Sequence, residues 1–393
     1  MSKEYQYIID DMHAELEQIL NYWTKFGIDN KDGGFVGQRD FYNTVVPNAD
    51  KGIILNTRLL WSFSAASNYL KSSKYESVCD RAYTYLKTYF KDKVYEGVFW
   101  EVNHLGIPTN TRKQVYAQAF AIYALSEYYK FSKKQEVKDW AITIFKNLEK
   151  YARVNKQAGY FEAFNEDWTP IADMRLSEKD MNAAKTMNTH LHVLEAYTSL
   201  LEIYNDKTLK DALVELIILF QNKFINDSGH YDLFFNEKWN RLSNTISFGH
   251  DIETAWLVIE AAKAIKDDTL LKETQVTAIK VIHAFLLEGI DQQGAVMNEK
   301  DTVSNKLDTD RHWWPQVEAL IGLKYGYTIS KNIDYLQKSK KIWNFTKKYL
   351  IDKENGEWHF RVDAMGLPYK QENKVSMWKA PYHTIRACII MNQ

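Results

Sequence analysis

The stretch DGGFVG at residues 32–37 is the first of six segments in which a glycine, mostly preceded by an acidic or polar residue, leads into β-prone or aromatic residues. The pattern returns every 62–70 residues along the chain. Self-similarity at a nearly fixed period is typical of proteins built from one repeated structural unit. The sequence therefore predicts six copies of one unit, marked by DGGFVG (32–37), EGVFWEV (96–102), AGYFEAF (158–164), SGHYDLFF (228–235), QGAVMNE (293–299) and NGEWHFRV (355–362).

Each segment lies between two helical patterns of different character. The preceding helix has a face rich in Lys and Glu, whereas the following helix is more apolar and carries Ala, Gly and aromatic residues close together. The preceding helices are predicted at roughly 5–26, 73–91, 134–152, 206–224, 270–287 and 332–350. The following helices are predicted at roughly 51–70, 112–130, 184–204, 249–265, 312–327 and 379–391.

A ring is the most natural arrangement of six such pairs, because apolar helices inside and amphipathic helices outside both bury their apolar surface. We therefore predict an all-α fold, an (α/α)6 barrel of six inner and six outer helices. No Pro-, Gly- or Ser-rich linker divides the chain, so we expect residues 1–393 to form a single (α/α)6-barrel domain. An open solenoid of the same six pairs is the alternative geometry.

The composition limits the classes of partner. Charged residues make up 26% of the 393 residues and balance to a net charge of -1, so no long-range field favours nucleic acid or an anionic membrane. No run of about 18 apolar residues, the length of a membrane span, is present. The only two cysteines, Cys79 and Cys388, fit neither a disulfide framework nor a zinc site, and no signal peptide is visible. We therefore expect a cytoplasmic protein, a monomer or weak homodimer.

Aromatic residues are abundant, with 12 Trp, 25 Tyr and 19 Phe. Most must lie in the core, but rings also stack on the C–H faces of sugars. An uncharged sugar is therefore a suitable small-molecule partner. The sequence shows no Gly-rich nucleotide loop, no HExxH and no EF-hand pattern, so we predict no cofactor and no metal.

Polar residues near the start of an inner helix need an explanation, because an unsatisfied buried polar group costs free energy. In KTMNTHLHVLEAYTSL, the residues Asn188, His192 and Glu195 share one helix face. SFGHDIETAW holds His250 and Glu253 three positions apart. Candidates that could face one mouth of the barrel in this way are Arg58, Tyr116, Asn188, His192, His250, Glu253, Trp313, Trp314 and His383.

Structural roles compete with functional ones at these positions. A single histidine on an apolar face is more often a core residue, but His250 and His383 both stand in the first turns of inner helices. His190 and His192 are two positions apart and point in different directions, which makes a metal pair unfavourable. Glu195 and Glu253 suit plain salt bridges equally well.

Two histidines aimed at one cavity suit proton transfer. A helix N-terminus opposes the imidazolium form, whereas a carboxylate such as Glu253 favours it, so His250 and His383 can differ in protonation. Such a pair can remove a proton α to a carbonyl on one face and return it on the other. Arg58 fits a role in stabilising the enediolate oxygens.

The motifs KTMNTHLHVLEAYT, SFGHDIE, WWPQVEA, WKAPYH and DKGIILNTRLLW resemble the N-acylglucosamine 2-epimerase superfamily, particularly its cellobiose 2-epimerase branch. The resemblance covers nearly the whole chain. It implies an (α/α)6 fold and a cis-enediol mechanism in which His250 and His383 are the acid/base pair at C2. One departure follows the last histidine, where the chain reads Thr384-Ile385-Arg386 and the branch has Asn-Gly-Arg or similar, and it bears on substrate choice.

The resemblance also implies roles for further residues. It assigns His192 to ring opening and Glu253 to support of His250. It assigns binding of the reacting sugar to Arg58, Tyr116, Asp180 and Asn188, and stacking on the substrate to Trp313, Trp314 and Trp378.

We therefore expect an isomerase that interconverts glucose and mannose configurations at the reducing end of β-1,4-linked disaccharides. The nearest alternative is a mannose 2-epimerase or aldose–ketose isomerase acting on free monosaccharides. A glycoside hydrolase on the same barrel would need two carboxylates, for which Glu162, Asp180 and Glu253 are available. A sugar-binding protein without catalysis is the third alternative.

Overall fold

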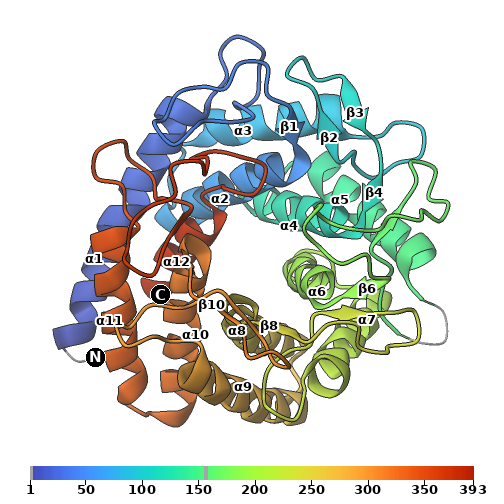
Figure 1. Cartoon of the computed structure of the whole chain (residues 1–393). Coiled ribbons are helices and arrows are strands. Elements are labelled where there is room, and N and C mark those ends of the chain that lie inside the picture. Colours follow the sequence, from blue (N-terminus) through green and yellow to red (C-terminus); the bar gives the residue numbers. More distant parts are fainter. Residues whose placement is uncertain (1–2, 155–157) are drawn as a thin grey trace.

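Helices in two concentric rings make up most of the computed structural model, which describes residues 3–154 and 158–393 (Figure 1). The inner ring consists of α2 (Ile53–Leu70), α4 (Val115–Ser132), α6 (Met187–Leu201), α8 (Phe248–Ile265), α10 (Trp313–Ser330) and α12 (Tyr382–Met391). The outer ring consists of α1 (Lys3–Tyr22), α3 (Glu76–Tyr85), α5 (Gln135–Asn147), α7 (Lys207–Leu219), α9 (Asp268–Glu288) and α11 (Asp334–Tyr349).

The inner ring is closed. Each inner helix packs against the next one along the chain, and α12 packs against α2 (Figure 1). The first outer helix, α1, packs on the last inner helix, α12, so the two ends of the chain meet. The predicted (α/α)6 barrel is confirmed, and the open solenoid is wrong for this chain. Within the described ranges, no helix has the length and apolar character needed to cross a membrane.

Burial separates the two rings as the sequence pattern predicted. In α2, every side chain from Ile53 to Ser67 is buried. The outer helices bury one face only, as in α5, where Val137, Trp140, Ala141 and Ile144 point inward. Four outer helices continue into a π-helical turn before the repeat segment; these turns are Trp23–Gly27, Leu86–Phe90, Leu148–Ala152 and Phe220–Phe224.

Short antiparallel strands connect successive repeats. They precede α2, α4 and α6, which therefore begin two or three residues later than predicted, whereas α8 and α10 begin within one residue of the predicted start. A strand before an inner helix pairs with a strand that follows the next repeat glycine. The pairs are β1 (Lys51–Gly52) with β2 (Glu101–Val102), β4 (Lys113–Gln114) with β5 (Ala163–Phe164), β6 (Lys185–Thr186) with β7 (Phe234–Phe235), β8 (Thr245–Ser247) with β9 (Glu299–Asp301) and β11 (Arg311–His312) with β12 (Arg361–Val362). Two of these sheets gain a third strand, β3 (Pro108–Asn110) or β10 (Leu307–Asp308).

Buried ion pairs reinforce the same links. Lys51 contacts Asp29 at 2.8 Å, and Lys113 contacts Asp92 at 2.5 Å. In each pair, a basic residue just before an inner helix reaches back to an acidic residue two to four positions before the preceding repeat segment. Arg311 and Asp291 repeat this arrangement. These three pairs hold the starts of α2, α4 and α10 at one end of the barrel.

The repeat glycines are required by backbone conformation and by close contacts. All six have positive φ. A Cβ at Gly97 would lie 2.6 Å from Oε1 of Gln118, whose amide accepts from the Val98 N–H and donates to the Val98 carbonyl, both at 2.9 Å. His190 Nε2 accepts from the Tyr160 N–H at 2.9 Å in the third repeat, so His190 is structural. Polar residues on the outward face of the inner helices thus hold the glycine turns.

Gly97→Ala is expected to destabilise the fold more than Gly33→Ala. Both positions have positive φ, which costs an alanine about 1–2 kcal/mol. A Cβ at Gly33 has its nearest neighbour at 3.9 Å, whereas at Gly97 the Gln118 amide must move and lose its bonds, at about 2 kcal/mol more. Urea denaturation of the two variants measures the difference. Equal losses of stability would contradict the role given to Gln118.

Candidate active site

A cavity of about 160 Å³ opens at the end of the barrel where the inner helices begin. Nearly every predicted site residue lines it, because each stands in the first two turns of an inner helix and faces inward. Trp378 lies in the segment before α12. The lining consists of Arg58, Tyr116, Asn188, His192, His250, Glu253, Trp313, Trp314, Phe360, Trp378 and His383. Phe360 was not predicted.

Asp180 is the exception among the predicted residues. It lies in the loop between β5 and β6, and its carboxylate accepts hydrogen bonds from the Ser177 N–H and hydroxyl at 2.9 and 2.8 Å. The described cavity wall does not include it. Its role in sugar binding stays a prediction.

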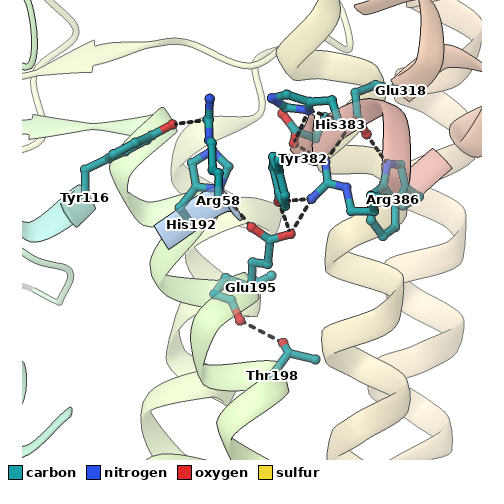
Figure 2. A network of polar contacts seen from close by, with 12 residues as sticks. Arg58, Tyr116, His192, Glu195, Thr198, Glu318, Tyr382, His383 and Arg386 are labelled. Atoms are coloured by element: carbon teal, nitrogen blue, oxygen red, sulfur yellow. Dashed lines mark hydrogen bonds and ion pairs between the residues drawn. The ribbon is translucent and has the colours of Figure 1, made fainter. Parts of the chain in front are cut away.

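A buried arginine connects three inner helices beneath the cavity (Figure 2). Arg386 of α12 contacts Glu195 of α6, Glu253 of α8 and Glu318 of α10, and the last contact measures 2.7 Å. Burial opposes the charge of Arg386, but the nearby carboxylates, Glu318 foremost, raise its pKa well above the usual value. The Tyr382 hydroxyl also contacts Arg386 and Glu195. These residues form the Arg386 network.

The Arg386 network also orients two histidines (Figure 2). Nδ1 of His192 lies 3.0 Å from Oε2 of Glu195, and Nδ1 of His383 lies 2.7 Å from Oε1 of Glu318. A neutral imidazole that donates its Nδ1 proton to a carboxylate keeps a lone pair on Nε2. Both histidines therefore have the tautomer in which Nε2 can accept a proton.

His250 has a different environment. Its Nδ1 lies 2.8 Å from the Ser247 hydroxyl. Burial, with a smaller contribution from His192, lowers the pKa of His250 to about 3. Burial, followed by the positive charges of Arg58 and Arg386, lowers the pKa of His383 well below its usual value. Both imidazoles are thus held neutral. The two pKa shifts have the same direction, so they do not give His250 and His383 the opposite protonation states that the sequence suggested.

Glu253 was expected to support His250, but its described contacts are with other residues. Glu253 binds Arg386, and its nearest described histidine contact is Nδ1 of His383 at 3.8 Å. A buried carboxylate gains more from a guanidinium than from a neutral imidazole. Glu253 is therefore part of the Arg386 network, in the salt-bridge role that was the alternative for this residue.

The buried charges do not balance without an added proton. Arg58 and Arg386 oppose the three carboxylates of Glu195, Glu253 and Glu318. Burial, reinforced by the charge of Glu318, raises the pKa of Glu253 to about 7. The site can therefore hold one exchangeable proton near neutral pH.

Among the described residues, Glu253, Glu318 and His383 lie close enough together to suggest a cation site. Arg386 already occupies it, since its Nη2 contacts both carboxylates. A metal ion would have to displace this guanidinium. The donor set therefore does not fit a metal, although the metal-free reaction stays a prediction.

Arg58 provides positive charge at the cavity itself. Its Nη2 donates to the Tyr116 hydroxyl at 3.0 Å, and its Nη1 donates to the Trp378 carbonyl at 3.1 Å. The guanidinium also lies over the Phe120 ring, 4.7 Å from its centre. A fixed guanidinium stabilises negative charge that develops on a bound ligand.

The indole ring of Trp314 and the side-chain amide of Asn188 complete the wall. The Trp314 ring centre lies 4.9 Å from that of His250 and 5.3 Å from that of His383, so this ring stands beside both histidines. Oδ1 of Asn188 is buried and has no hydrogen-bond partner in the described part of the chain. It can accept a hydrogen bond from a hydroxyl of the ligand.

Sequence analysis missed three polar members of the site, Glu318, Tyr382 and Arg386. Arg386 follows His383 by three positions, so helix periodicity could have placed both on one face of α12. Glu318 lies in the quoted motif WWPQVEA but was not singled out.

Comparison with known proteins shows the family to which this chain belongs. The family description N-acylglucosamine 2-epimerase (GlcNAc 2-epimerase) matches residues 33–387. The cellobiose 2-epimerase of Bacteroides fragilis is 40% identical over 381 residues, which are 96% of this chain and 97% of that protein. The structure of cellobiose 2-epimerase from Bacillus thermoamylovorans superposes with a TM-score of 0.94 at 37% identity and covers 98% of both chains. A D-mannose isomerase structure, with a TM-score of 0.84, 20% identity and 98% coverage of both chains, shares the fold. A cavity lined by histidines and a guanidinium, together with this similarity over the full barrel, shows that the chain belongs to the N-acylglucosamine 2-epimerase family and is a carbohydrate 2-epimerase.

Proposed function

We propose that this protein epimerises the reducing-end sugar of cellobiose and related β-1,4-linked disaccharides at C2, as a single catalytic domain without cofactor or metal. The observation that carries the proposal is that His250 and His383 come from α8 and α12 to line one cavity, with the Trp314 ring beside both. The similarity to cellobiose 2-epimerases supports the choice of substrate.

The reaction begins with the open-chain aldehyde. His192, oriented by Glu195, assists ring opening. One of the two histidines, His250 or His383, then takes the C2 proton, and the C–H electron pair forms the C1–C2 double bond of a cis-enediolate. The negative charge develops on the sugar oxygens, where Arg58 stabilises it. The other histidine returns a proton to the opposite face of C2, so that no oxidant or reductant is needed.

The charge balance of the site suits this exchange. A two-base epimerase needs one neutral histidine as the base and one proton that the other histidine can deliver. Three buried carboxylates and two guanidinium groups leave room for one proton. At rest this proton belongs to Glu253, and both histidines are neutral. When it moves to His383, the ionised Glu253 at 3.8 Å and Glu318 at 2.7 Å from Nδ1 stabilise the imidazolium.

The cavity dimensions suit one sugar ring. Its volume of about 160 Å³ lies below the roughly 300 Å³ at which sites for larger ligands begin. The reducing-end ring fits inside and contacts Tyr116, Asn188 and Trp313, while the second ring extends past Trp378 at the rim. A free monosaccharide also fits this volume, so mannose epimerisation or isomerisation is the second candidate.

The hydrolase alternative lacks a suitable pair of carboxylates. Glu253 is bound by Arg386, and Glu162 accepts hydrogen bonds from the Thr186 N–H at 2.6 Å and the Thr189 hydroxyl at 2.5 Å, outside the described cavity wall. Both carboxylates are therefore bound to other protein groups and do not form the pair that hydrolysis needs.

Purified protein is expected to interconvert glucosyl-glucose and glucosyl-mannose with a β-1,4 linkage, with no added metal or nucleotide. EDTA should leave the rate unchanged, because Arg386 fills the only described cation position of the site. Chromatography of products from cellobiose, lactose, mannose and glucose measures the preference. Conversion of mannose alone, fructose as the main product or free glucose from cellobiose would each replace the proposed reaction.

Replacement of either central histidine is expected to stop epimerisation in both directions. A general acid–base group contributes about 10²–10⁴ in rate, so His250→Asn and His383→Asn should each lower kcat at least about a hundredfold. His283→Asn, at an exposed position of α9, is the control and should keep the wild-type rate.

In heavy water, the two variants should differ in the epimer that exchanges. With one base left, each variant can remove and return the C2 proton on one face only. One should therefore incorporate deuterium into glucose-ended sugar and the other into mannose-ended sugar, each faster than product forms. Near-wild-type epimerisation by both single variants would refute the two-histidine mechanism.

The pH dependence should report the Glu253 carboxyl. Its pKa is raised to about 7, so the group is protonated and uncharged below that pH and ionised above it. Because this is the one exchangeable proton that the site holds, and a two-base exchange needs one protonated group, kcat/KM should fall as the pH rises through about 7. Glu253→Gln should lower kcat/KM and remove this inflection. An unchanged inflection in the variant would assign it to another group.

A further inference from the structure

A second cavity lies inside the barrel at the end opposite to the active site. Its volume is about 380 Å³, and its wall comes from the second halves of α2, α4, α6, α8 and α12. The described linings of the two cavities have no residue in common. Between them stands the Arg386 network, since Arg386 and Glu195 belong to the wall of the second cavity.

The wall combines aromatic rings with paired charges. Trp61 stacks on Tyr123 with ring centres 5.2 Å apart. Lys130 bridges Glu127 and Glu202 at 2.9 and 2.7 Å. Apolar rings beside grouped donors and acceptors are the features that bind the C–H faces and hydroxyl groups of a neutral sugar or polyol.

The charge of the wall disfavours anions. The inner helices end on this side of the barrel, and helix C-termini carry partial negative charge. Carboxylates also outnumber cations in the wall, with Glu127, Glu195, Glu202 and Glu260 against Lys130 and Arg386. A phosphorylated sugar would therefore be repelled where a neutral one is not.

Two residues of the wall, Glu195 and Arg386, also belong to the network that holds His192 and His383. Glu195 contacts Nδ1 of His192, and Arg386 contacts Glu318, the partner of His383. A hydroxyl bound at Glu195 or Arg386 would compete for these hydrogen bonds. Binding in the second cavity is therefore connected to the active site through one buried network.

We propose that the second cavity binds a neutral polyhydroxylated molecule, a sugar or polyol, and that this binding changes catalysis through Arg386 and Glu195. The network then has two arrangements, one with its present hydrogen bonds and one in which a ligand hydroxyl replaces some of them. The ligand can shift catalysis only by as much as its affinity differs between these two arrangements. Coupling of this kind is reciprocal, so an occupied active site also alters affinity in the second cavity.

Binding is tested with D-sorbitol and methyl β-D-glucopyranoside, which have no free aldehyde and cannot be epimerised. Lys130→Met removes the bridging cation, and Ala65→Phe fills part of the cavity from α2. Calorimetry should show binding weakened at least about tenfold in both variants, through a lost charged hydrogen bond in Lys130→Met and through lost space in Ala65→Phe. Lys300→Met is the matched control, because Lys300 also pairs with a glutamate and its side chain is 26% exposed against 25% for Lys130.

The kinetic arm separates this site from the active site. Saturating probe should change kcat for the epimerised sugar by about fivefold or more in wild type and Lys300→Met. At the same probe concentration, the effect on kcat should be clearly smaller in Lys130→Met and Ala65→Phe, in proportion to their lower occupancy. A probe that raises KM alone, and equally in all four proteins, binds only in the active site and overturns the proposal.

Two further outcomes also overturn it. If the probes do not bind, or bind equally well in wild type, Lys130→Met and Ala65→Phe, the second cavity holds only water. Binding of glucose 6-phosphate there as tightly as the neutral probes would refute the proposed class of ligand. The calorimetric arm needs no turnover, so its result stands even if the protein fails to epimerise cellobiose.

Discussion

The interior of the barrel depends on one guanidinium. Arg386 belongs to the last inner helix, and its contacts with Glu195, Glu253 and Glu318 join α12 to α6, α8 and α10. Apolar packing would accept several rotations of α12 about its axis, whereas the planar fork of Arg386 is satisfied in one. Loss of one partner in a buried group of this kind leaves uncompensated charge and costs about 3–5 kcal/mol. Ring closure and site geometry therefore share one constraint.

The same constraint sets the electrostatics of the site. Glu195 and Glu318 use one carboxylate each to hold Arg386 and a histidine, so the network fixes the tautomers of His192 and His383. The inner helices also begin at the cavity, and their N-termini favour negative charge there. This arrangement keeps the imidazoles neutral, so that either can act as the base at C2, and it stabilises the enediolate that forms.

Local signals explain what the sequence could predict. The glycine period and the apolar faces predicted the closed rings, and helix periodicity directed His250, His383 and Arg58 to one cavity. The partner of Glu253 could not be predicted, because Arg386 lies 133 residues away and meets it only when the ring closes. Asp180 belongs to a loop without periodicity, so nothing in the sequence fixes its direction.

Polar residues of the inner helices lie on two faces. Those on the outward face stabilise the glycine turns, and those on the inward face line the cavity. Gln118 and Gln316 point outward and bond the backbone of Val98 and Val296 in the glycine turns. Two positions earlier, Tyr116 and Trp314 line the cavity. Residues two apart lie about 200° apart around a helix, so neighbouring polar positions cannot exchange roles. A substitution on the inward face therefore changes the chemistry of the site while the turns persist, whereas one two positions away loosens the scaffold that aims the site.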